Sequence, residues 1–417
     1  MVRSDDDQGA IRGIIRRYYA VWLTYSLAGG FLFGVYPIFL HSRGLTQFEI
    51  NSVLAAYFVV LFLTDVPTGA FADALGRRRA FVLGAAMRTI AFVVYFFARH
   101  YWIFLIAESI DGIGTTFGNG AIDAWGVDAL DLAGYEGLKD RLFSRISQLT
   151  TIGFMVSAIG GSYIADINLA WPWLCGAVGY VISAVIGFSL MTGEKHDSAG
   201  VDWLGLPGMI LRRVIDGFSA GFDSKTVLML SAAGAVQVAA WSPYWLEWPL
   251  LFNQSYGVGV WIIGWIYCAL SAGRMLGAEI VSRSRPDQAS RPGRVAALVG
   301  AASVMLAVAG MLQARPNVVL IILFVMNIFS GATQPLLQSW FNEQVESEHR
   351  ATLLSFNSTF ATMGGSIGLI VNGYIADRAG LPVAWQFAGM LSLFAIPCYL
   401  ALRSGARAVE LPAPAAK

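Results

Sequence analysis

The chain is poor in charged residues. Lysine, arginine, aspartate and glutamate make up 13% of its 417 residues, whereas a soluble domain carries about a quarter. So small a share excludes an ordinary soluble globular domain and indicates a chain whose solvent is mostly lipid. The net charge is only +1, so composition gives no electrostatic basis for binding nucleic acid.

Cysteine and histidine are scarce as well. The three cysteines, Cys175, Cys268 and Cys398, lie in apolar runs without metal or redox spacing, which favours a packing role. The four histidines fall near expected helix ends or in loops, without the spacing of a metal site or of a nucleophile and its base. The sequence therefore predicts no metal, no cofactor, no catalytic residues and no enzyme. The polar, basic start "MVRSDDDQGAIRGIIRRYY" does not resemble a cleavable signal peptide.

Long apolar runs are what the chain has instead, since 56% of its residues are hydrophobic. A helix of about 20 apolar residues crosses the ~30 Å of hydrocarbon in a bilayer, and open strands would leave backbone groups unsatisfied there. We expect an all-α integral membrane protein of twelve transmembrane helices in two six-helix bundles. The expected spans lie near residues 17–40, 46–72, 79–98, 102–129, 142–165, 172–192, 225–252, 257–281, 294–314, 317–341, 350–374 and 382–402.

One long connection, residues 193–224, divides the chain into an N-terminal bundle at 1–192 and a C-terminal bundle at 225–417. Within it, "WLGLPGMILRRVIDGF" would suit an amphipathic helix at the membrane surface. Lysine and arginine gather on the side that holds both termini, and the opposite side has only Arg43, Arg99, Arg315 and Arg378. The positive-inside rule therefore places both termini in the cytoplasm of a multi-pass protein of the cell membrane.

The two halves resemble each other in sequence. "LFSRISQLTTIGFMVSAIGGSYIAD" at 142–166 and "LLSFNSTFATMGGSIGLIVNGYIAD" at 353–377 align without gaps. The spacing of these two segments is close to that between "YPIFL" at 36–40 and "WPLLF" at 248–252. This pattern indicates an internal duplication of a six-helix unit. Two like halves related by an axis along the membrane normal are typical of transporters, whose site lies between them.

The turn between the second and third runs reads "GAFADALGRRR", from Gly69 to Arg79. It resembles, at every position, the signature loop of the Major Facilitator Superfamily, written G-x-x-x-D-x-x-G-R-R/K. With the twelve runs and the two halves, the resemblance covers nearly the whole chain. It implies a secondary transporter that works by alternating access.

The same loop suggests a gating latch. We expect Gly69 to allow close helix approach and Gly76 to permit the tight turn. Asp73 would pair with Arg77, and Asp128 at the end of the fourth run would extend that pair. In the resembled family such a network latches the cytoplasmic side. Anchoring by the positive-inside rule alone is the alternative.

Two other stretches only partly match the family. "GFMVSAIGGS" in the fifth run keeps the small residues of the glycine-rich stretch of drug–proton antiporters, but Ala158 stands where proline is expected; small-residue packing explains it equally well. "ESIDGIG" in the fourth run has Glu108 where many exporters of the family have arginine. The coupling scheme of those exporters is therefore not transferred to this chain.

Polar residues repeat at helical spacing in the fourth and tenth runs. The fourth run carries Glu108, Asp111, Thr115, Asn119 and Asp123, and the tenth carries Asn327, Gly331, Gln334 and Gln338. We expect these two stripes to line one cavity. Hydrogen bonding between helices away from any cavity is the alternative.

Ionisable groups inside a bilayer are expensive and usually functional. Counted from the turns on either side, Asp65, Arg88 and Asp111 reach a similar depth, and Glu108 lies a turn further out. One arginine cannot neutralise three carboxylates, so at least one should hold a proton, as a proton carrier requires. Asp111 is the expected partner of Arg88, and Glu108 and Asp65 are the candidate carriers. A fixed structural ion pair is the alternative.

Aromatic residues in the first and seventh runs suggest a wall for an amphipathic or aromatic substrate. They are Trp22 and Tyr25, and Trp241 and Trp245 beside Glu247. With Thr115, Asn119, Asn327, Gln334 and Gln338, they form the predicted substrate site. An interfacial aromatic belt is the alternative explanation.

These patterns predict a proton-coupled exporter of small amphipathic or aromatic compounds, energised by the proton gradient and functional as a monomer in the lipid bilayer. An uptake carrier or facilitator for a small organic anion, with Arg88 and Arg274 binding the ligand, is the chief alternative. A non-transporting membrane sensor or scaffold is a third, from another class.

Overall fold

A computed structural model of the chain describes residues 5–135, 139–192, 224–284, 290–344 and 350–405, together with residues 208, 221 and 222. No strand occurs within those ranges. The connection predicted at 193–224, with its amphipathic helix, lies almost entirely outside the described residues. Contacts divide the chain into two compact units: unit 1 is Met1–Leu211 with Leu246–Cys268, and unit 2 is Arg212–Trp245 with Ala269–Lys417. The domain boundaries predicted from the sequence remain a prediction.

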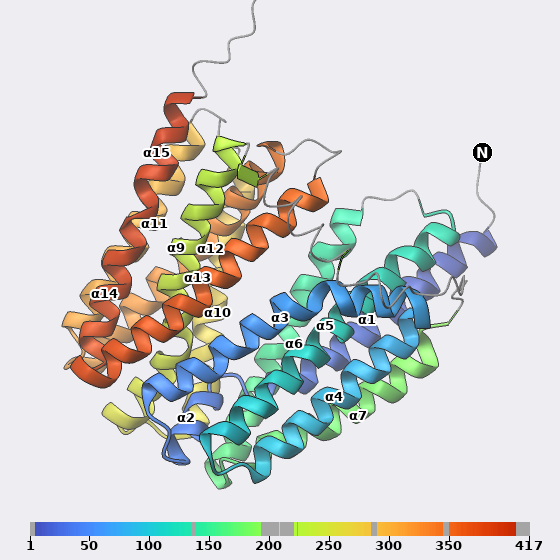
Figure 1. Cartoon of the computed structure of the whole chain (residues 1–417), viewed down its shortest axis with the longest axis horizontal. Coiled ribbons are helices and arrows are strands. Elements are labelled where there is room, and N and C mark those ends of the chain that lie inside the picture. Colours follow the sequence, from blue (N-terminus) through green and yellow to red (C-terminus); the bar gives the residue numbers. More distant parts are fainter. Residues whose placement is uncertain are drawn as a thin grey trace, which may run out of the picture. The chain divides into compact units, whose positions relative to one another are not determined.

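Seven helices before residue 193 belong to unit 1 (Figure 1). They are α1 (Asp5–Gly30), α2 (Tyr36–Ser42), α3 (Gln47–Leu75), α4 (Arg77–Phe97), α5 (Tyr101–Leu132), α6 (Lys139–Ile167) and α7 (Trp171–Leu190). Within this unit α4 packs against both α5 and α7, and α1 packs against α6 and α7.

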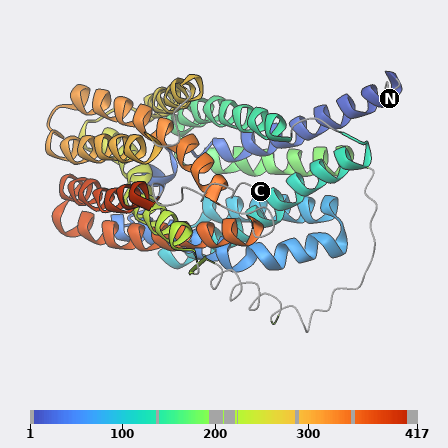
Figure 2. The same cartoon turned by 90° about the horizontal axis from the view of Figure 1, so that it is seen from above.

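The later described helices begin with α9 (Lys225–Leu250), which ends in a π-helical turn, η1 (Leu251–Ser255), just after Pro249. The others are α10 (Val260–Arg283), α11 (Arg291–Met311), α12 (Pro316–Gln344), α13 (Arg350–Ala379), α14 (Leu381–Leu393) and α15 (Ala395–Gly405). In unit 2, α11 packs against α12 and α14, as α4 packs against α5 and α7 in unit 1. Seen from above, the helices run as rods beside their neighbours (Figure 2).

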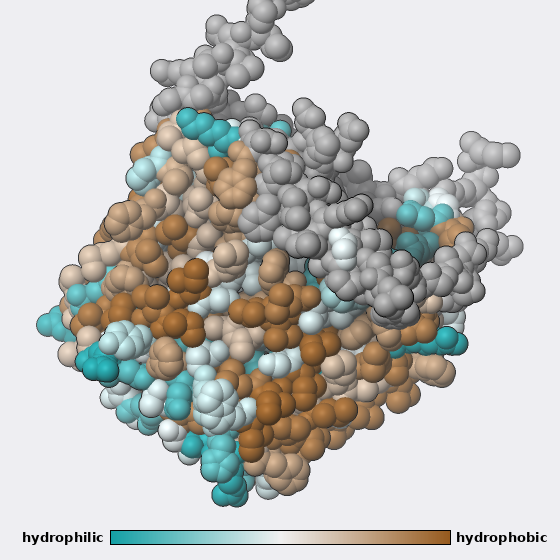
Figure 3. Space-filling view, in the orientation of Figure 1, coloured by the Kyte–Doolittle hydropathy of each residue, from teal (hydrophilic) through white to brown (hydrophobic). Residues whose placement is uncertain are grey.

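Each of the twelve predicted spans is mainly helical in the described residues, although the first is interrupted at residues 31–35, so the all-α membrane fold is confirmed. Ten of the described helices are long and apolar enough to cross a bilayer. Hydrophobic residues cover much of the visible face (Figure 3). Large apolar side chains such as Leu63, Phe97 and Trp102 are exposed, as expected where the solvent is lipid tails.

Local sequence signals explain how α3 begins and ends. Thr46 caps the first turn of α3, because its hydroxyl accepts a hydrogen bond from the Glu49 backbone N–H while the Glu49 carboxylate accepts one from the Thr46 N–H. At the other end Gly76 has φ of 95° and separates α3 from α4. Only glycine adopts this conformation readily, so Gly76 sets the tight turn of the signature loop.

Small residues bring the helices of each unit into close contact. A Cβ on Gly161 of α6 would lie 2.0 Å from the carbonyl oxygen of Phe31, next to α1. A Cβ on Gly368 of α13 would lie 2.1 Å from the carbonyl oxygen of Ala239 of α9. Gly153, like Gly161, sits against the first span, near Ser26. The small residues of α6 therefore have a packing role, whatever else they do.

Candidate functional site

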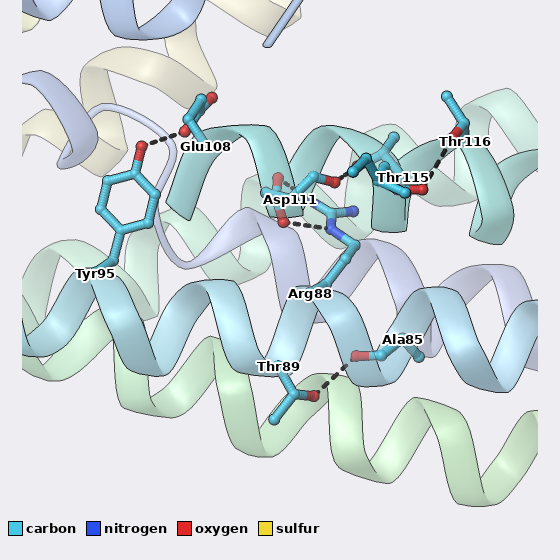
Figure 4. Close-up of polar contacts among 9 residues, drawn as sticks. Ala85, Arg88, Thr89, Tyr95, Glu108, Asp111, Thr115 and Thr116 are labelled. Carbon is cyan, nitrogen blue, oxygen red and sulfur yellow. Dashed lines mark hydrogen bonds and ion pairs between the residues drawn. The ribbon is translucent and has the colours of Figure 1, made fainter. Parts of the chain in front are cut away.

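A buried ion pair joins α4 to α5 in unit 1 (Figure 4). The Arg88 Nε donates to Asp111 Oδ1 at 2.8 Å, and its Nη2 donates to Oδ2 at 3.1 Å. The two side chains are only 13% and 9% exposed. A bidentate pair of this kind is strong and fixes both side chains. The sequence predicted this partner for Arg88 from depth alone.

Two glycines let α4 and α5 approach closely enough for this pair. A Cβ on Gly84 would lie 2.6 Å from the Gly114 carbonyl oxygen, and a Cβ on Gly114 would lie 2.7 Å from Arg88 Cγ. Any larger residue at either position would separate the helices or displace the arginine. The close approach therefore places the charged pair inside the unit.

Aromatic rings surround the Arg88 guanidinium. Its central carbon lies 4.4 Å from the ring centroid of Tyr180, 5.3 Å from that of Tyr25 and 5.8 Å from that of Phe92. Such contacts between a cation and π faces are stabilising, more so when the cation is desolvated. Tyr25, which the sequence placed in the substrate wall, is 3% exposed, so its ring faces the arginine rather than open space.

Glu108 lies one turn before Asp111 on α5 and is 5% exposed. Its carboxylate accepts a hydrogen bond from the Tyr95 hydroxyl of α4 (Figure 4). The Tyr95 hydroxyl is 3.3 Å from the Tyr36 hydroxyl of α2. Within the described residues, Glu108 forms no ion pair of its own. The buried cluster of Glu108, Arg88 and Asp111 therefore contains two carboxylates and one cation.

Further along α5, the polar stripe is used in several ways. Thr115 is buried, and its hydroxyl donates to the Asp111 carbonyl oxygen at 2.8 Å. Asn119 is exposed. Asp123 is half-buried and accepts hydrogen bonds from the Tyr18 hydroxyl at 2.6 Å and from Trp22 Nε1 at 3.0 Å. The predicted substrate residue Trp22 thus binds an acid of the stripe through its indole nitrogen.

Asp65 does not join the cluster. Its side chain is exposed on α3, and within the described part of the chain its carboxylate has no ion pair with Arg88. Counting residues from the turns predicted a depth for Asp65, but it could not predict which face of α3 the side chain occupies. Its role as a proton carrier stays a prediction.

The signature loop contains both of the pairs expected for a latch. Arg77 forms an ion pair with Asp73, and its Nε lies 3.7 Å from Asp128 Oδ2 at the end of α5. A Cβ on Gly69 would meet no atom of the described residues within 4 Å, so the close helix approach expected there stays a prediction. Whether the network acts as a latch stays a prediction.

In unit 2 the predicted aromatic residues have neutral partners or a cation. Trp241 Nε1 donates to Gln237 Oε1 at 3.2 Å. The Arg274 guanidinium lies 5.2 Å from the Trp245 ring centroid. Both tryptophans are half-buried. Their indole rings are thus partly exposed within their own unit.

The polar stripe of α12 is divided between buried and exposed positions. Asn327 is 1% exposed and donates to the Tyr244 hydroxyl at 3.1 Å. Gln334 and Gln338 are exposed. Glu247, near the end of α9, is fully buried and belongs to unit 1. Of this predicted set, Asn327 and Glu247 are therefore enclosed by protein.

Sequence reasoning missed the tyrosines that enclose the charged cluster. Tyr95 follows Arg88 by seven residues, two turns on the same face of α4, so helical spacing alone would have found it. Tyr36 lies in a short helix beyond the break in the first span. Tyr180 comes from α7, which has no charged residue to draw attention to it. No local pattern indicates that its ring would cover Arg88.

Comparisons with known proteins agree with this fold. A sequence model of the Major Facilitator Superfamily matches residues 20–315 and 289–417. The chain is 22% identical over 377 residues to the multidrug efflux pump Tap of Mycolicibacterium fortuitum, a match that covers 86% of this chain and 88% of that protein. It is also 22% identical over 172 residues to multidrug resistance protein 2 of Bacillus subtilis, covering 40% of this chain and 42% of the relative.

Among solved structures, that of the nucleoside transporter NupG matches with a TM-score of 0.74 at 14% identity, covering 93% of this chain and 98% of that one. At this identity the likeness is one of fold. The family match confirms the resemblance first seen in the Gly69–Arg79 loop, and these relatives are transporters rather than enzymes. The chain therefore belongs to the Major Facilitator Superfamily and is a multi-pass membrane transporter.

Proposed function

We propose that this transporter couples proton entry to the export of small amphipathic or aromatic compounds. The observation that carries the proposal is the imbalance of the buried cluster. Arg88 and Asp111 neutralise each other through two hydrogen bonds. Among the residues that the structure describes, Glu108 beside them has a hydroxyl donor but no cation of its own. A buried carboxyl in this setting is costly as an anion and acceptable when protonated, which suits a group that takes up and releases a proton.

The ion pair argues against an anion carrier that uses Arg88 to bind its ligand. Both Asp111 oxygens accept hydrogen bonds from the guanidinium, and aromatic rings cover the cation. An anionic substrate would have to displace Asp111 and strand a buried carboxylate, which is strongly unfavourable. Arg88 is better suited to positioning Asp111 next to Glu108.

Export of partly apolar compounds is supported by the relatives, whose names describe multidrug efflux and resistance. The proposed substrate site combines exposed amides and half-buried indoles with several buried side chains. Exposed amides and indoles accommodate aromatic ligands through stacking and a few polar contacts. The site consists of Trp22, Tyr25, Thr115, Asn119, Trp241, Trp245, Glu247, Asn327, Gln334 and Gln338.

The remaining assignments complete the proposal. Glu108 and Asp65 are the proton carriers, and Arg88 and Asp111 form a neutral ion pair next to Glu108. Gly69, Asp73, Gly76, Arg77 and Asp128 form the gating latch. The protein acts as a monomer in the cell membrane with both termini in the cytoplasm, and the proton gradient supplies the energy.

The test compares two assays on the same reconstituted variants, with ethidium as the first probe of a panel of aromatic cations and neutral aromatics. Glu108→Gln and Asp65→Asn should lose accumulation driven by a pH gradient but keep counterflow exchange, which needs no net proton movement. Glu279→Gln is the matched control, because Glu279 is exposed and pairs with Arg283 on its own helix. Full gradient-driven accumulation in both Glu108→Gln and Asp65→Asn would refute proton coupling through these acids.

A further inference from the structure

We propose that Tyr95 and Tyr36 form a hydrogen-bonded relay through which Glu108 exchanges its proton with water at the α2 end of unit 1. The inference rests on the proposed function and adds a path to it. Glu108 is 5% exposed and Tyr95 is fully buried, so direct contact between the carboxyl and bulk water is small. Tyr36 is less enclosed than Tyr95 and is the first residue of α2, seven residues or about 10 Å of helix from the loop that leads to α3. The relay requires water to reach the Tyr36 hydroxyl from that end.

The three groups form an unbroken series of oxygens. The Tyr95 hydroxyl donates its one proton to the Glu108 carboxylate. Because that proton is used in this bond, Tyr36 is the donor in the 3.3 Å contact between the two hydroxyls, and Tyr36 also lies close to Glu108 itself. Both donors thus point toward the acid, which is the orientation needed for proton movement from Tyr36 to Glu108.

Trp173 of α7 holds the relay in place. Its indole is stacked on the Tyr95 ring, with centroids 3.9 Å apart and planes 5° apart. It also packs against the Tyr36 ring, with centroids 6.0 Å apart. Trp173 is 1% exposed. With both rings fixed by the same buried indole, only the hydroxyl hydrogens need to move.

The proton transfer balances without a charged tyrosine intermediate. A hydronium ion gives a proton to Tyr36, Tyr36 gives its own to Tyr95, and Tyr95 gives its own to the Glu108 carboxylate. Three O–H bonds break and three form, both phenols end neutral, and Glu108 ends as a carboxylic acid. Rotation of the two hydroxyls then restores the starting orientation. A free phenol has a pKa near 10, so concerted transfer avoids a step that would form buried tyrosinate.

Among the described residues, the other ionisable groups around Glu108 form no hydrogen bond with its carboxylate. They are Arg88 on α4, Asp111 on α5 and Tyr57 on α3. Arg88 and Asp111 are committed to each other. For the described residues, the Glu108 carboxylate accepts a hydrogen bond from Tyr95, and Tyr95 leads to Tyr36. The path therefore runs along α4 and α2.

The test uses the purified full-length protein and needs no transported compound. Time-resolved infrared spectroscopy after a rapid drop in pH follows the carbonyl band of protonated Glu108, assigned by its loss in Glu108→Gln. Tyr36→Phe and Tyr95→Phe keep the stacked rings and remove only the hydroxyls. We expect each to slow the appearance of the band by roughly a hundredfold, while the final amplitude in Tyr36→Phe stays near that of the wild type.

Tyr101→Phe is the matched control, because that hydroxyl bonds to Ser52 outside the relay, and it should protonate Glu108 at the wild-type rate. Wild-type rates in both relay variants would overturn the relay, even if Glu108→Gln abolishes gradient-driven transport and the proposed function stands. A wild-type protein without any titrating Glu108 band would overturn the relay as well. In that case, retained gradient-driven transport in Glu108→Gln and Asp65→Asn would show separately that the proposed function fails.

Discussion

Replacing Arg88 with methionine should destabilise the protein more than any other single charge removal in unit 1. The substitution keeps much of the side-chain length and removes the cation, so Asp111 stays buried without a partner. In the native protein both Asp111 oxygens are bonded, at 2.8 and 3.1 Å, and the carboxylate side chain is 9% exposed. Water therefore cannot easily replace the guanidinium.

The size of the effect follows from the burial of the pair. Opposite charges about 4 Å apart attract by ~4 kcal/mol at an effective dielectric constant of about 20. Removing one partner of a buried pair typically costs about 3–5 kcal/mol, because the other charge is left uncompensated. The double variant Arg88→Met/Asp111→Leu removes both charges and should recover most of the lost stability, since replacing a whole buried pair by apolar residues is often nearly neutral.

The assay is thermal unfolding of the purified variants in detergent, followed by intrinsic fluorescence. We expect a clear fall in melting temperature for Arg88→Met and a smaller one for the double variant. Arg283→Met is the control, because its pair with Glu279 spans a single helical turn and its side chain is 79% exposed; surface pairs contribute little. The pair does not act as described if Arg88→Met has the same melting temperature as the wild type. The same conclusion follows if the double variant has a lower melting temperature than Arg88→Met.

Three further predictions concern other parts of the fold. Asp73→Asn and Arg77→Ala should each reduce transport strongly at near-normal expression, since they break the loop network; wild-type transport rates in both would rule out the latch. A cysteine at Asn119, which is exposed, should react with water-soluble thiol reagents in a background without native cysteines, whereas one at Ile113 should react poorly; equal labelling would argue against an aqueous polar stripe. Gly161→Leu should greatly lower the yield of folded protein, because a Cβ there already lies 2.0 Å from a backbone oxygen; a normal yield and melting temperature would show that the first span and α6 can separate.

Most of the fold could be predicted from the sequence because apolar length, turn residues and the internal duplication all follow from local patterns. The break in the first span could not. Residues 18–40 carry no charged side chain, so hydropathy shows a single run, yet α1 ends at Gly30 and α2 begins at Tyr36. The intervening Gly34 has φ of 81°, and Pro37 lies in the first turn of α2. Both are suited to a break, but neither requires one.

Residue counting predicted which site residues lie at a similar distance along neighbouring helices, but not the direction in which each side chain points. Counting residues from a shared turn works for α4 and α5, because the two helices are antiparallel neighbours and rise equally, so Arg88 and Asp111 meet. The same count for Asp65 gave a depth in the membrane but did not show which side of α3 carries its side chain. Nor does spacing along a single helix predict contacts with a third helix, which is why the covering of Arg88 by Tyr180 was not foreseen.

The buried cluster also has an electrical consequence. Arg88 and Asp111 sum to zero charge, so the cluster changes by one elementary charge when Glu108 gains a proton. In a cycle that uses this cluster as its proton store, exchange of one proton for a neutral compound moves a net charge across the membrane, worth ~2.3 kcal/mol per 100 mV. Exchange for a singly charged organic cation moves none. The membrane voltage would then drive export of the neutral compound but not of the cation, so the substrate itself would determine which part of the ion gradient drives its export.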